Sequence, residues 1–278
     1  MLRVAAVSGK RQTRSGLALF LCLLFAGFCT TACSRAEPEP SKAAASSCNI
    51  EPAQFTPYRV DTVFDGDTLR LVGGDKVRLI GINTPERGRK GRPAQPLAME
   101  ATASLKALIG PDRRIFLRDG RDSRDRYGRR LAHVFDSDGN NLAAELLRLG
   151  MGFHVAISPN FADVQCLQAA EIEAAAEGRG VWSETELGPR LAGDLDPSQG
   201  GFIRIRGRVT RVSFKDNGWW VQLDGKVGLQ IKNASQYLFQ RERLRQLQGQ
   251  VVEARGWLIP MKGGWWMMNI GHPSMLVF

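Results

Sequence analysis

Three short strand-like segments follow one another between Tyr58 and Ile80, and this pattern constrains the fold more than any other feature of the chain. The segments read YRVDTVF, LRLV and KVRLI, and they are separated by Asp65-Gly66-Asp67 and Gly73-Gly74-Asp75. Alternating apolar runs bounded by Gly and Asp are typical of strands joined by tight hairpin turns. The sequence therefore predicts a small antiparallel sheet that begins near residue 58.

Segments with helical spacing alternate with further strands in the following region. Apolar periodicity predicts helices over 97–109, 141–149 and 163–177, and each of these segments is followed by a glycine. Residues 114–119 and 131–135 have the composition of strands. We therefore expect residues 57–185 to form one domain of the α+β class, mainly β with helices.

A second domain is expected after a linker at 186–200, which is rich in Gly, Pro and Asp. Strands are predicted over 202–213, 218–224, 227–231, 250–258 and 265–270, with a helical insert near 234–247. Several short strands with one interposed helix are typical of a small Greek-key barrel of the oligonucleotide-binding (OB) type. Residues 201–278 are therefore predicted to be an OB-like domain.

The first 33 residues have the order of an export signal. Basic residues precede an apolar run from Leu17 to Phe28, which is short for a transmembrane helix. Ala32-Cys33 resembles the end of a bacterial lipobox, although Thr30 stands where leucine is usual, so Cys33 is a candidate lipidation site. Cleavage near Ala32 or Ala36 and release as a soluble protein is the alternative. Residues 34–56, rich in Ala, Ser, Pro and Glu at their start, are expected to be a flexible linker.

The cysteine count agrees with export. If Cys33 carries a lipid, Cys48 and Cys166 remain as an even pair in the mature chain. An oxidising compartment favours a disulfide between them, and two unpaired thiols are the alternative. The histidines do not lie near a cysteine pair in the sequence, so the spacing gives no indication of zinc.

Charge is distributed unevenly along the chain. The net charge is +10, and residues 201–278 hold twelve basic and four acidic residues. A basic domain most often binds a polyanion. The C-terminal domain is therefore expected to have nucleic acid as its partner.

Three polar clusters of the first domain suit phosphodiester hydrolysis. They are Asp65-Gly66-Asp67-Thr68, the segment from Arg78 to Glu86, and Asp125-Arg126-Tyr127-Gly128-Arg129. Asp67, Asn83 and a backbone carbonyl are hard oxygen ligands of the kind that Ca²⁺ prefers. Two guanidinium groups can stabilise charge that develops on a phosphate, and Glu86 can accept a proton from the attacking water. Each cluster taken alone is more often an ordinary hairpin turn or surface ion pair.

Together the three clusters resemble the staphylococcal nuclease family from about Tyr58 to Trp182, including Asn-Leu-Ala-Ala-Glu-Leu-Leu and Gly-Val-Trp-Ser. The resemblance implies that the first domain is also an OB-type barrel, so that two small Greek-key barrels follow the signal peptide and the tether. It implies Ca²⁺-dependent hydrolysis of DNA and RNA to 3′-phosphate ends. By matching position, the catalytic residues are Arg78, Glu86 and Arg129. The implied metal ligands are Asp67, Asn83 and the carbonyl of Thr84, with Asp65 nearby through water.

Two departures from the family pattern bear on activity. Asn83 stands where well-known members have aspartate, which removes one negative charge and predicts weaker Ca²⁺ binding. In the segment 151–160, Val155 and Ile157 replace tyrosines that pack a base in the family, so base stacking falls to other residues such as Tyr127. These departures bear on substrate preference and not on the core chemistry.

Two further groups are candidates for contacts with nucleic acid. The first is the basic loop after Glu86, which either guides the substrate backbone or is only a solvated loop; its members are Arg87, Arg89, Lys90 and Arg92. The second lies in the C-terminal domain, where alternating arginines of one strand share a face near paired tryptophans; it comprises Arg204, Arg206, Arg208, Trp219 and Trp220. The alternative is that these tryptophans fill the barrel and the arginines keep its edge soluble.

The sequence therefore predicts an exported Ca²⁺-dependent nuclease, held at the cell envelope by a lipid on Cys33. Its C-terminal barrel would bind nucleic acid, with single strands favoured, and no protein partner is implied. A catalytically weak or inactive nucleic-acid-binding envelope protein is the alternative, which Asn83 favours and the retained Arg78, Glu86 and Arg129 oppose. A third hypothesis is that the C-terminal barrel binds a protein or a cell-wall component.

Overall fold

A computed structural model describes residues 48–88, 91, 93–196 and 200–277. The predicted signal segment, its candidate lipidation site Cys33 and most of the predicted linker 34–56 lie outside these residues, as do Arg89, Lys90 and Arg92. Within the described part of the chain, no helix is both long and apolar enough to span a bilayer.

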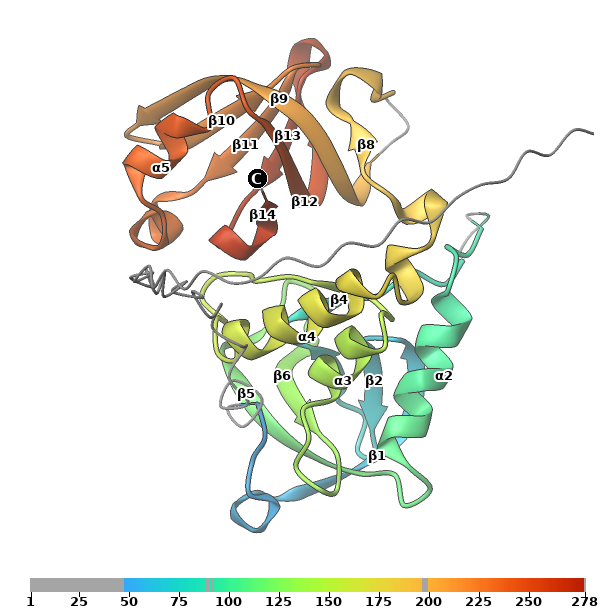
Figure 1. The fold of residues 1–278 in the computed structure, drawn as a ribbon. Helices are drawn as coiled ribbons and strands as arrows, with labels where there is room; N and C mark the ends of the chain where they lie inside the picture. Colours follow the sequence, from blue (N-terminus) through green and yellow to red (C-terminus); the bar gives the residue numbers. More distant parts are fainter. Residues whose placement is uncertain (1–47, 89–90, 92, 197–199, 278) are drawn as a thin grey trace, which may run out of the picture. The chain divides into compact units, whose positions relative to one another are not determined.

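The first domain is a closed five-stranded barrel with the strand order β1-β2-β3-β6-β5 (Figure 1). The strands are β1 (Pro57–Asp65), β2 (Thr68–Leu71), β3 (Lys76–Leu79), β5 (Arg114–Arg124) and β6 (Arg130–Phe135). Neighbouring strands are antiparallel except β3 and β6, which pair in parallel with Arg78 opposite Leu131. The predicted hairpins of the segment 58–80 are therefore the start of a barrel.

Three helices accompany this barrel: α2 (Ala98–Ile109), α3 (Leu142–Arg148) and α4 (Val164–Ala176). The Asn141 side chain begins α3 by accepting hydrogen bonds from the N–H groups of Ala143 and Ala144. Helix α3 ends at Gly150, whose φ of +70° is the left-handed conformation that glycine adopts most easily. The buried faces of these helices share one hydrophobic core with the inner residues of the barrel.

A two-stranded sheet joins the loop after β3 to the region before α4. It consists of β4 (Ile82–Asn83) and β7 (Phe153–His154), with Asn83 opposite Phe153. The chain enters β4 through Gly81, where φ is +91° and a Cβ atom would lie 2.3 Å from Leu167. Glycine is therefore required there, because a side chain would meet α4 in a strained backbone conformation.

The end of the predicted flexible linker is attached to the first domain. Cys48 and Cys166 form a disulfide whose Cα atoms are 5.9 Å apart, and Cys48 is buried in the core. The Ile50 N–H donates to the Gly139 carbonyl, and η1 (Pro52–Gln54) follows. Residues 48–56 are thus part of the folded domain, which corrects the expectation that the tether extends to residue 56.

The second domain is also a closed barrel, because β9 pairs with both β10 and β12. Its strands are β9 (Gly201–Lys215), β10 (Gly218–Leu223), β11 (Val227–Ile231), β12 (Val251–Pro260) and β13 (Trp266–Asn269). The helical insert comprises η5 (Asn233–Leu238) and α5 (Arg241–Gln246), and β14 (Leu276–Val277) adds to β12. The prediction of two OB-type barrels in an α+β chain is confirmed.

The segment predicted as a linker contains regular structure. Its elements are η3 (Thr185–Leu187), β8 (Arg190–Leu191) and η4 (Ala192–Asp194), and the remaining short helices are η2 (Gly180–Trp182), η6 (Lys262–Gly264) and η7 (Pro273–Met275). Strand β8 pairs in parallel with β9. The described part of 186–200 is therefore built into the second sheet.

A buried ion pair connects the two barrels, which belong to one compact unit. Arg255 of β12 donates to both carboxylate oxygens of Glu171 on α4, at 2.6 and 2.5 Å, and to the Ser274 carbonyl at 3.0 Å. Glu171 also accepts the His154 N–H at 2.7 Å. Because His154 belongs to β7, the second barrel is connected through these contacts to the sheet that carries Asn83.

Candidate active site

The site begins at the turn between β1 and β2, where the Asp65 and Asp67 carboxylates are both buried. A Cβ atom on Gly66, between them, would lie 2.7 Å from Ala101 of α2 and 2.8 Å from Thr84. The turn therefore packs too closely against its surroundings to carry any side chain at this position. This close approach fixes Asp67 beside the chain that follows β4.

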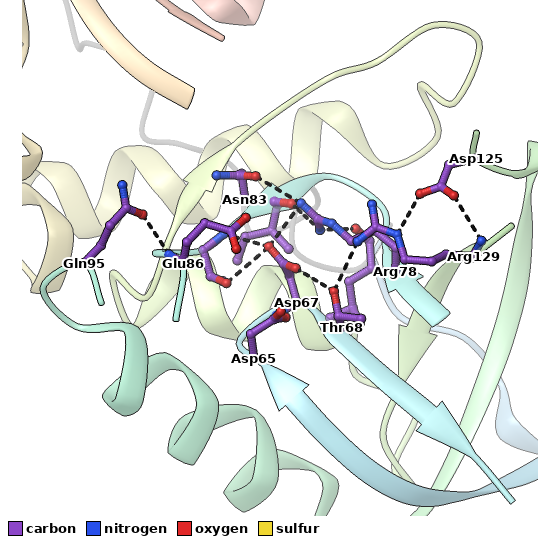
Figure 2. A network of polar contacts seen from close by, with 12 residues as sticks. Asp65, Asp67, Thr68, Arg78, Asn83, Glu86, Gln95, Asp125 and Arg129 are labelled. Carbon is purple, nitrogen blue, oxygen red and sulfur yellow. Dashed lines mark hydrogen bonds and ion pairs between the residues drawn. The ribbon is translucent and has the colours of Figure 1, made fainter. Parts of the chain in front are cut away.

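Asp67 is the centre of the polar network in Figure 2. Its Oδ2 atom accepts hydrogen bonds from the N–H and hydroxyl groups of Thr84, at 2.9 and 3.1 Å. The same oxygen lies 3.0 Å from Nη2 of Arg78, and Oδ1 accepts the Thr68 hydroxyl at 3.0 Å. The carboxylate is thus fixed in position by three elements of the first barrel.

Arg78 reaches the site from β3 and is largely buried. Its Nη1 atom donates to the carbonyls of Leu79 and Ile82, at 2.9 and 2.8 Å. Its Nη2 atom donates to Asn83 Oδ1 at 3.1 Å and lies against Asp67. The guanidinium group is therefore held between a charged acceptor, Asp67, and a neutral acceptor, Asn83, next to β4.

Arg129 reaches this network through Thr68. Asp125 accepts its backbone N–H at 3.0 Å and its Nε–H at 2.7 Å. Burial raises the pKa of Asp125, but hydrogen bonds from Arg129 outweigh this effect, so the pKa is lowered overall. Nη1 of Arg129 lies 3.5 Å from the Thr68 hydroxyl. A continuous row of polar contacts thus runs from Arg129 through Thr68 and Asp67 to Arg78.

Glu86 follows this network on the loop after β4. Its backbone N–H donates to Gln95 Oε1 at 2.7 Å, while the residue is exposed to solvent. Figure 2 shows the Glu86 side chain extending toward Asp67 and Asn83. Glu86 therefore stands at the solvent edge of the cluster and is not buried among the candidate ligands.

The electrostatics of the two aspartates are unusual. Burial raises the pKa of Asp65 to about 6, and the nearby Asp67 charge adds to this effect. The Asp67 N–H donates to Asp65 Oδ1 at 3.2 Å, so the two groups share one turn. Two neighbouring buried carboxylates are more stable when a cation lies near them.

The donor set fits a hard divalent cation. It offers the carboxylates of Asp65 and Asp67, the amide oxygen of Asn83 and the Thr84 carbonyl, which are the oxygen types that Ca²⁺ prefers. Among the described residues there is no place where three or more His, Cys, Asp or Glu side chains converge as a metal site. Within this set the charged side chains are Asp65 and Asp67, because position 83 is an asparagine.

The predicted nucleic-acid contacts of the first domain differ in accessibility. Tyr127 is 69% exposed and lies beside the guanidinium groups of Arg126 and Arg129, at 4.8 and 5.7 Å from its ring centroid. Arg87 is partly buried and donates to the Phe64 carbonyl at 2.9 Å. Tyr127 thus stands open at the site, whereas Arg87 is anchored to β1.

The predicted contacts of the second domain are mostly used within the protein. Arg204 pairs with Glu253 at 2.7 Å and lies 4.6 Å from the centroid of Trp182. Arg206 also pairs with Glu253, and the exposed Arg208 donates to the Gly249 carbonyl. Trp219 is buried, as the alternative interpretation expects, and Trp220 is partly buried over Gly228. The structure therefore does not gather these residues into one open surface.

Sequence reasoning gave no role to Thr68, Asp125 or Gln95. Thr68 bridges Arg129 to Asp67, Asp125 orients Arg129, and Gln95 holds the Glu86 backbone. Thr68 and Asp125 lie inside the polar clusters of the sequence analysis, so their position in these clusters could have indicated a role in the site. No comparable signal marks Gln95, which lies at the end of the loop before α2 and reaches back to Glu86.

Known proteins are similar in sequence to the first domain. The family described as "Staphylococcal nuclease homologue" matches residues 76–184. A thermonuclease of Staphylococcus intermedius is 32% identical over 128 residues, which cover 45% of this chain and 75% of the relative. Endonuclease YhcR of Bacillus subtilis is 30% identical over 138 residues, which cover 46% of this chain and 11% of the relative. Endonuclease YncB of the same organism is 29% identical over 130 residues, which cover 45% of this chain and 61% of the relative.

Proposed function

Since the chain belongs to the staphylococcal nuclease family, we propose that it is an exported, Ca²⁺-dependent nuclease that hydrolyses DNA or RNA to 3′-phosphate ends. The observation that carries the proposal is the row of contacts from Arg129 through Thr68 and Asp67 to Arg78. Two guanidinium groups and a buried carboxylate belong to this one row of contacts. Such an arrangement is suited to a phosphate that carries increasing negative charge during hydrolysis.

The two arginines bind the reacting phosphate. Asp125 fixes Arg129 through its Nε–H, so that the outer part of the guanidinium is directed toward Thr68 and the site. Arg78 is fixed through the Leu79 and Ile82 carbonyls. Because both groups are held before substrate binds, little reorganisation is needed when charge develops.

Glu86 accepts the proton of the attacking water. Its exposed position gives it access to solvent, and the bond from its backbone N–H to Gln95 holds the loop that carries it. A carboxylate acts as a general base when it lies within hydrogen-bond reach of the water and of the reacting group. The extension of Glu86 toward Asp67 supports this role, because it keeps the carboxylate at the solvent side of the cluster.

Asp67, Asn83 and the Thr84 carbonyl would hold Ca²⁺, with Asp65 close by. When bound, this ion neutralises negative charge on the phosphate oxygens. Asp67 keeps its position through Thr84 and Thr68, so the ligand set is ordered by the protein itself. One charge fewer at Asn83 suits a compartment with about 10⁻⁴–10⁻³ M Ca²⁺.

The N-terminal sequence supports export. The basic residues and the apolar run from Leu17 to Phe28 have the order of a signal peptide, and Cys33 is the proposed lipid attachment point. The Cys48–Cys166 disulfide is compatible with an oxidising compartment. Incorporation of labelled palmitate into the wild type and not into Cys33→Ala tests the anchor.

The decisive experiment is cleavage of single-stranded DNA and RNA by the mature protein, with Ca²⁺ and with EDTA. Glu86→Gln and Arg129→Ala should each reduce cleavage by more than about a hundredfold, as removal of one group that stabilises the transition state does. Arg70→Ala is the matched control, because Arg70 forms an exposed ion pair with Asp61. The wild type could instead bind nucleic acid and cleave it only at a background rate, which neither EDTA nor the two variants change. In that case the binding-protein hypothesis replaces the nuclease.

A further inference from the structure

A pocket beside the proposed site has walls from both barrels. Residues of the β4 loop form one side, namely Asn83, Thr84 and Pro85. Phe202 of β9 and the exposed Arg190 of β8 belong to the opposite side. Gln95, which holds the Glu86 backbone, also lines it. The pocket therefore extends the proposed cleavage site directly onto the second domain.

Exposed aromatic and apolar side chains continue from this pocket along the second barrel. The Phe202 ring lies 5.2 Å from the Trp257 ring, edge to face, and these residues are opposite each other on β9 and β12. Trp257 and Ile259 both face outward on β12 and are 38% exposed, whereas Leu258 between them is buried. Met261 and Trp265 follow at the connection to β13 and are 48% and 37% exposed.

Two lysines lie near these side chains, one in the same hairpin and one in the turn between β10 and β11. Lys262 is next to Met261, and the ammonium of Lys226 lies close to Gly264, beside Trp265. Exposed aromatic rings next to cations are the usual equipment for a single-stranded polynucleotide, because bases stack on the rings and phosphates pair with the charges. This surface differs from the predicted arginine stripe, whose Arg204 is paired with Glu253.

We propose that a single-stranded polynucleotide passes from the cleavage site through this pocket and across Trp257 and Trp265, so that the second barrel holds the strand being cut. The proposal rests on the proposed nuclease function and names the path of its substrate. Arg190 contacts a phosphate at the pocket, and Trp257 and Trp265 each stack on a base. Base stacking on an aromatic ring is sequence-tolerant, so the path adds affinity without selecting a base.

The test compares a trinucleotide with a 15-nucleotide single strand, both fluorescently labelled, by anisotropy in EDTA. Trp257→Ala and Trp265→Ala should each weaken binding of the 15-mer about tenfold and leave the trinucleotide unchanged. Trp257→Phe, which keeps an aromatic ring, should restore most of the affinity. Tyr237→Ala is the matched control, because Tyr237 is 74% exposed on η5 of the same barrel.

The outcomes separate this inference from the proposed activity, because binding in EDTA requires no hydrolysis. If the 15-mer binds as predicted but the protein cuts nothing, the strand path stands and the nuclease proposal fails. If cleavage is active while both tryptophan variants behave like Tyr237→Ala, the strand path is overturned. Loss of binding to anionic phospholipid vesicles in Trp257→Ala, with 15-mer binding intact, overturns it as well and assigns the surface to a membrane.

Discussion

Replacing Arg255 by methionine would leave a buried carboxylate without its counter-charge. Glu171 is 3% exposed and Arg255 is 6% exposed, and two hydrogen bonds join their charged groups. In Arg255→Met, the Glu171 carboxylate keeps only the His154 N–H among the contacts described above. The second barrel also loses its charged contact with α4.

The expected loss is about 3–5 kcal/mol in the free energy of unfolding, as for other buried pairs from which one partner is removed. Burial already raises the pKa of Glu171, and Arg255 acts against this rise. Without Arg255 the pKa of Glu171 rises further. A carboxyl whose pKa is raised in the folded state destabilises the fold above that pKa, and the effect disappears as the pH falls toward its unfolded value. The loss is therefore larger at pH 8 than at pH 5.

The assay is urea unfolding followed by tryptophan fluorescence at both pH values. Arg255→Met combined with Glu171→Gln should recover most of the loss, because a neutral amide still accepts the His154 N–H. Arg206→Met is the control, since Arg206 is 53% exposed and pairs at the surface with Glu253. If Arg255→Met is no less stable than this control, the ion pair does not hold the barrels together as we infer.

Three other variants or conditions test the site and the core. Asn83→Asp should lower the Ca²⁺ concentration for half-maximal cleavage by about tenfold, because it adds a negative charge to the ligand set; an unchanged Ca²⁺ titration contradicts this. Gly66→Ala should cost about 1–3 kcal/mol and most of the activity, since its Cβ would lie 2.7 Å from a side chain of α2, whereas Gly193→Ala, with open space around it, should do neither. Burial lowers the pKa of His133 to about 4 and of His154 to about 3, so the unfolded chain takes up protons below pH 6.5 that the folded chain does not. Each histidine should lower the free energy of unfolding by up to about 1.4 kcal/mol per pH unit from pH 6.5 toward pH 5. Removing one in His133→Gln should therefore make the urea midpoint less dependent on pH between 7 and 5 than in the wild type, and the same pH dependence in both proteins would refute this.

The elements that could be predicted from sequence are those whose signals are local. The hairpin glycines Gly66 and Gly73 mark the ends of β1 and β2, and Asn141 marks the beginning of α3. Turn and capping residues act on neighbours within a few positions, so the sequence contains the whole interaction. The predicted catalytic and metal-binding residues of the first domain also lie around Asp67, because each belongs to a motif at or near the end of a strand.

The interactions that were missed join residues far apart in the chain. Glu171 and Arg255 are 84 positions apart, and neither residue stands in a motif. Strand β8 is only Arg190–Leu191, and it forms because β9 offers a free edge rather than through its own composition. The periodicity of β9 puts Arg204 in a basic stripe, but its guanidinium group pairs with Glu253 and lies over the Trp182 ring. Such pairings depend on how segments distant in the sequence pack together, which no local pattern records.

Asn83 has a second consequence that follows from the geometry of Arg78. Four contacts occupy the two Nη atoms of this guanidinium, and those on Nη2 are Asn83 Oδ1 and the charged Asp67. A substrate phosphate must displace at least one of them to bind through an Nη hydrogen. The neutral amide is the weaker of the two side-chain acceptors, because hydrogen bonds to ionised groups are roughly twice as strong. Aspartate at position 83 would hold Arg78 more firmly while attracting Ca²⁺ more strongly. Asparagine therefore weakens the cation site but lets the Arg78 guanidinium exchange its contact with residue 83 for one with phosphate more easily. We therefore expect Asn83→Asp to need less Ca²⁺ without a proportionate gain in kcat/KM at saturating Ca²⁺.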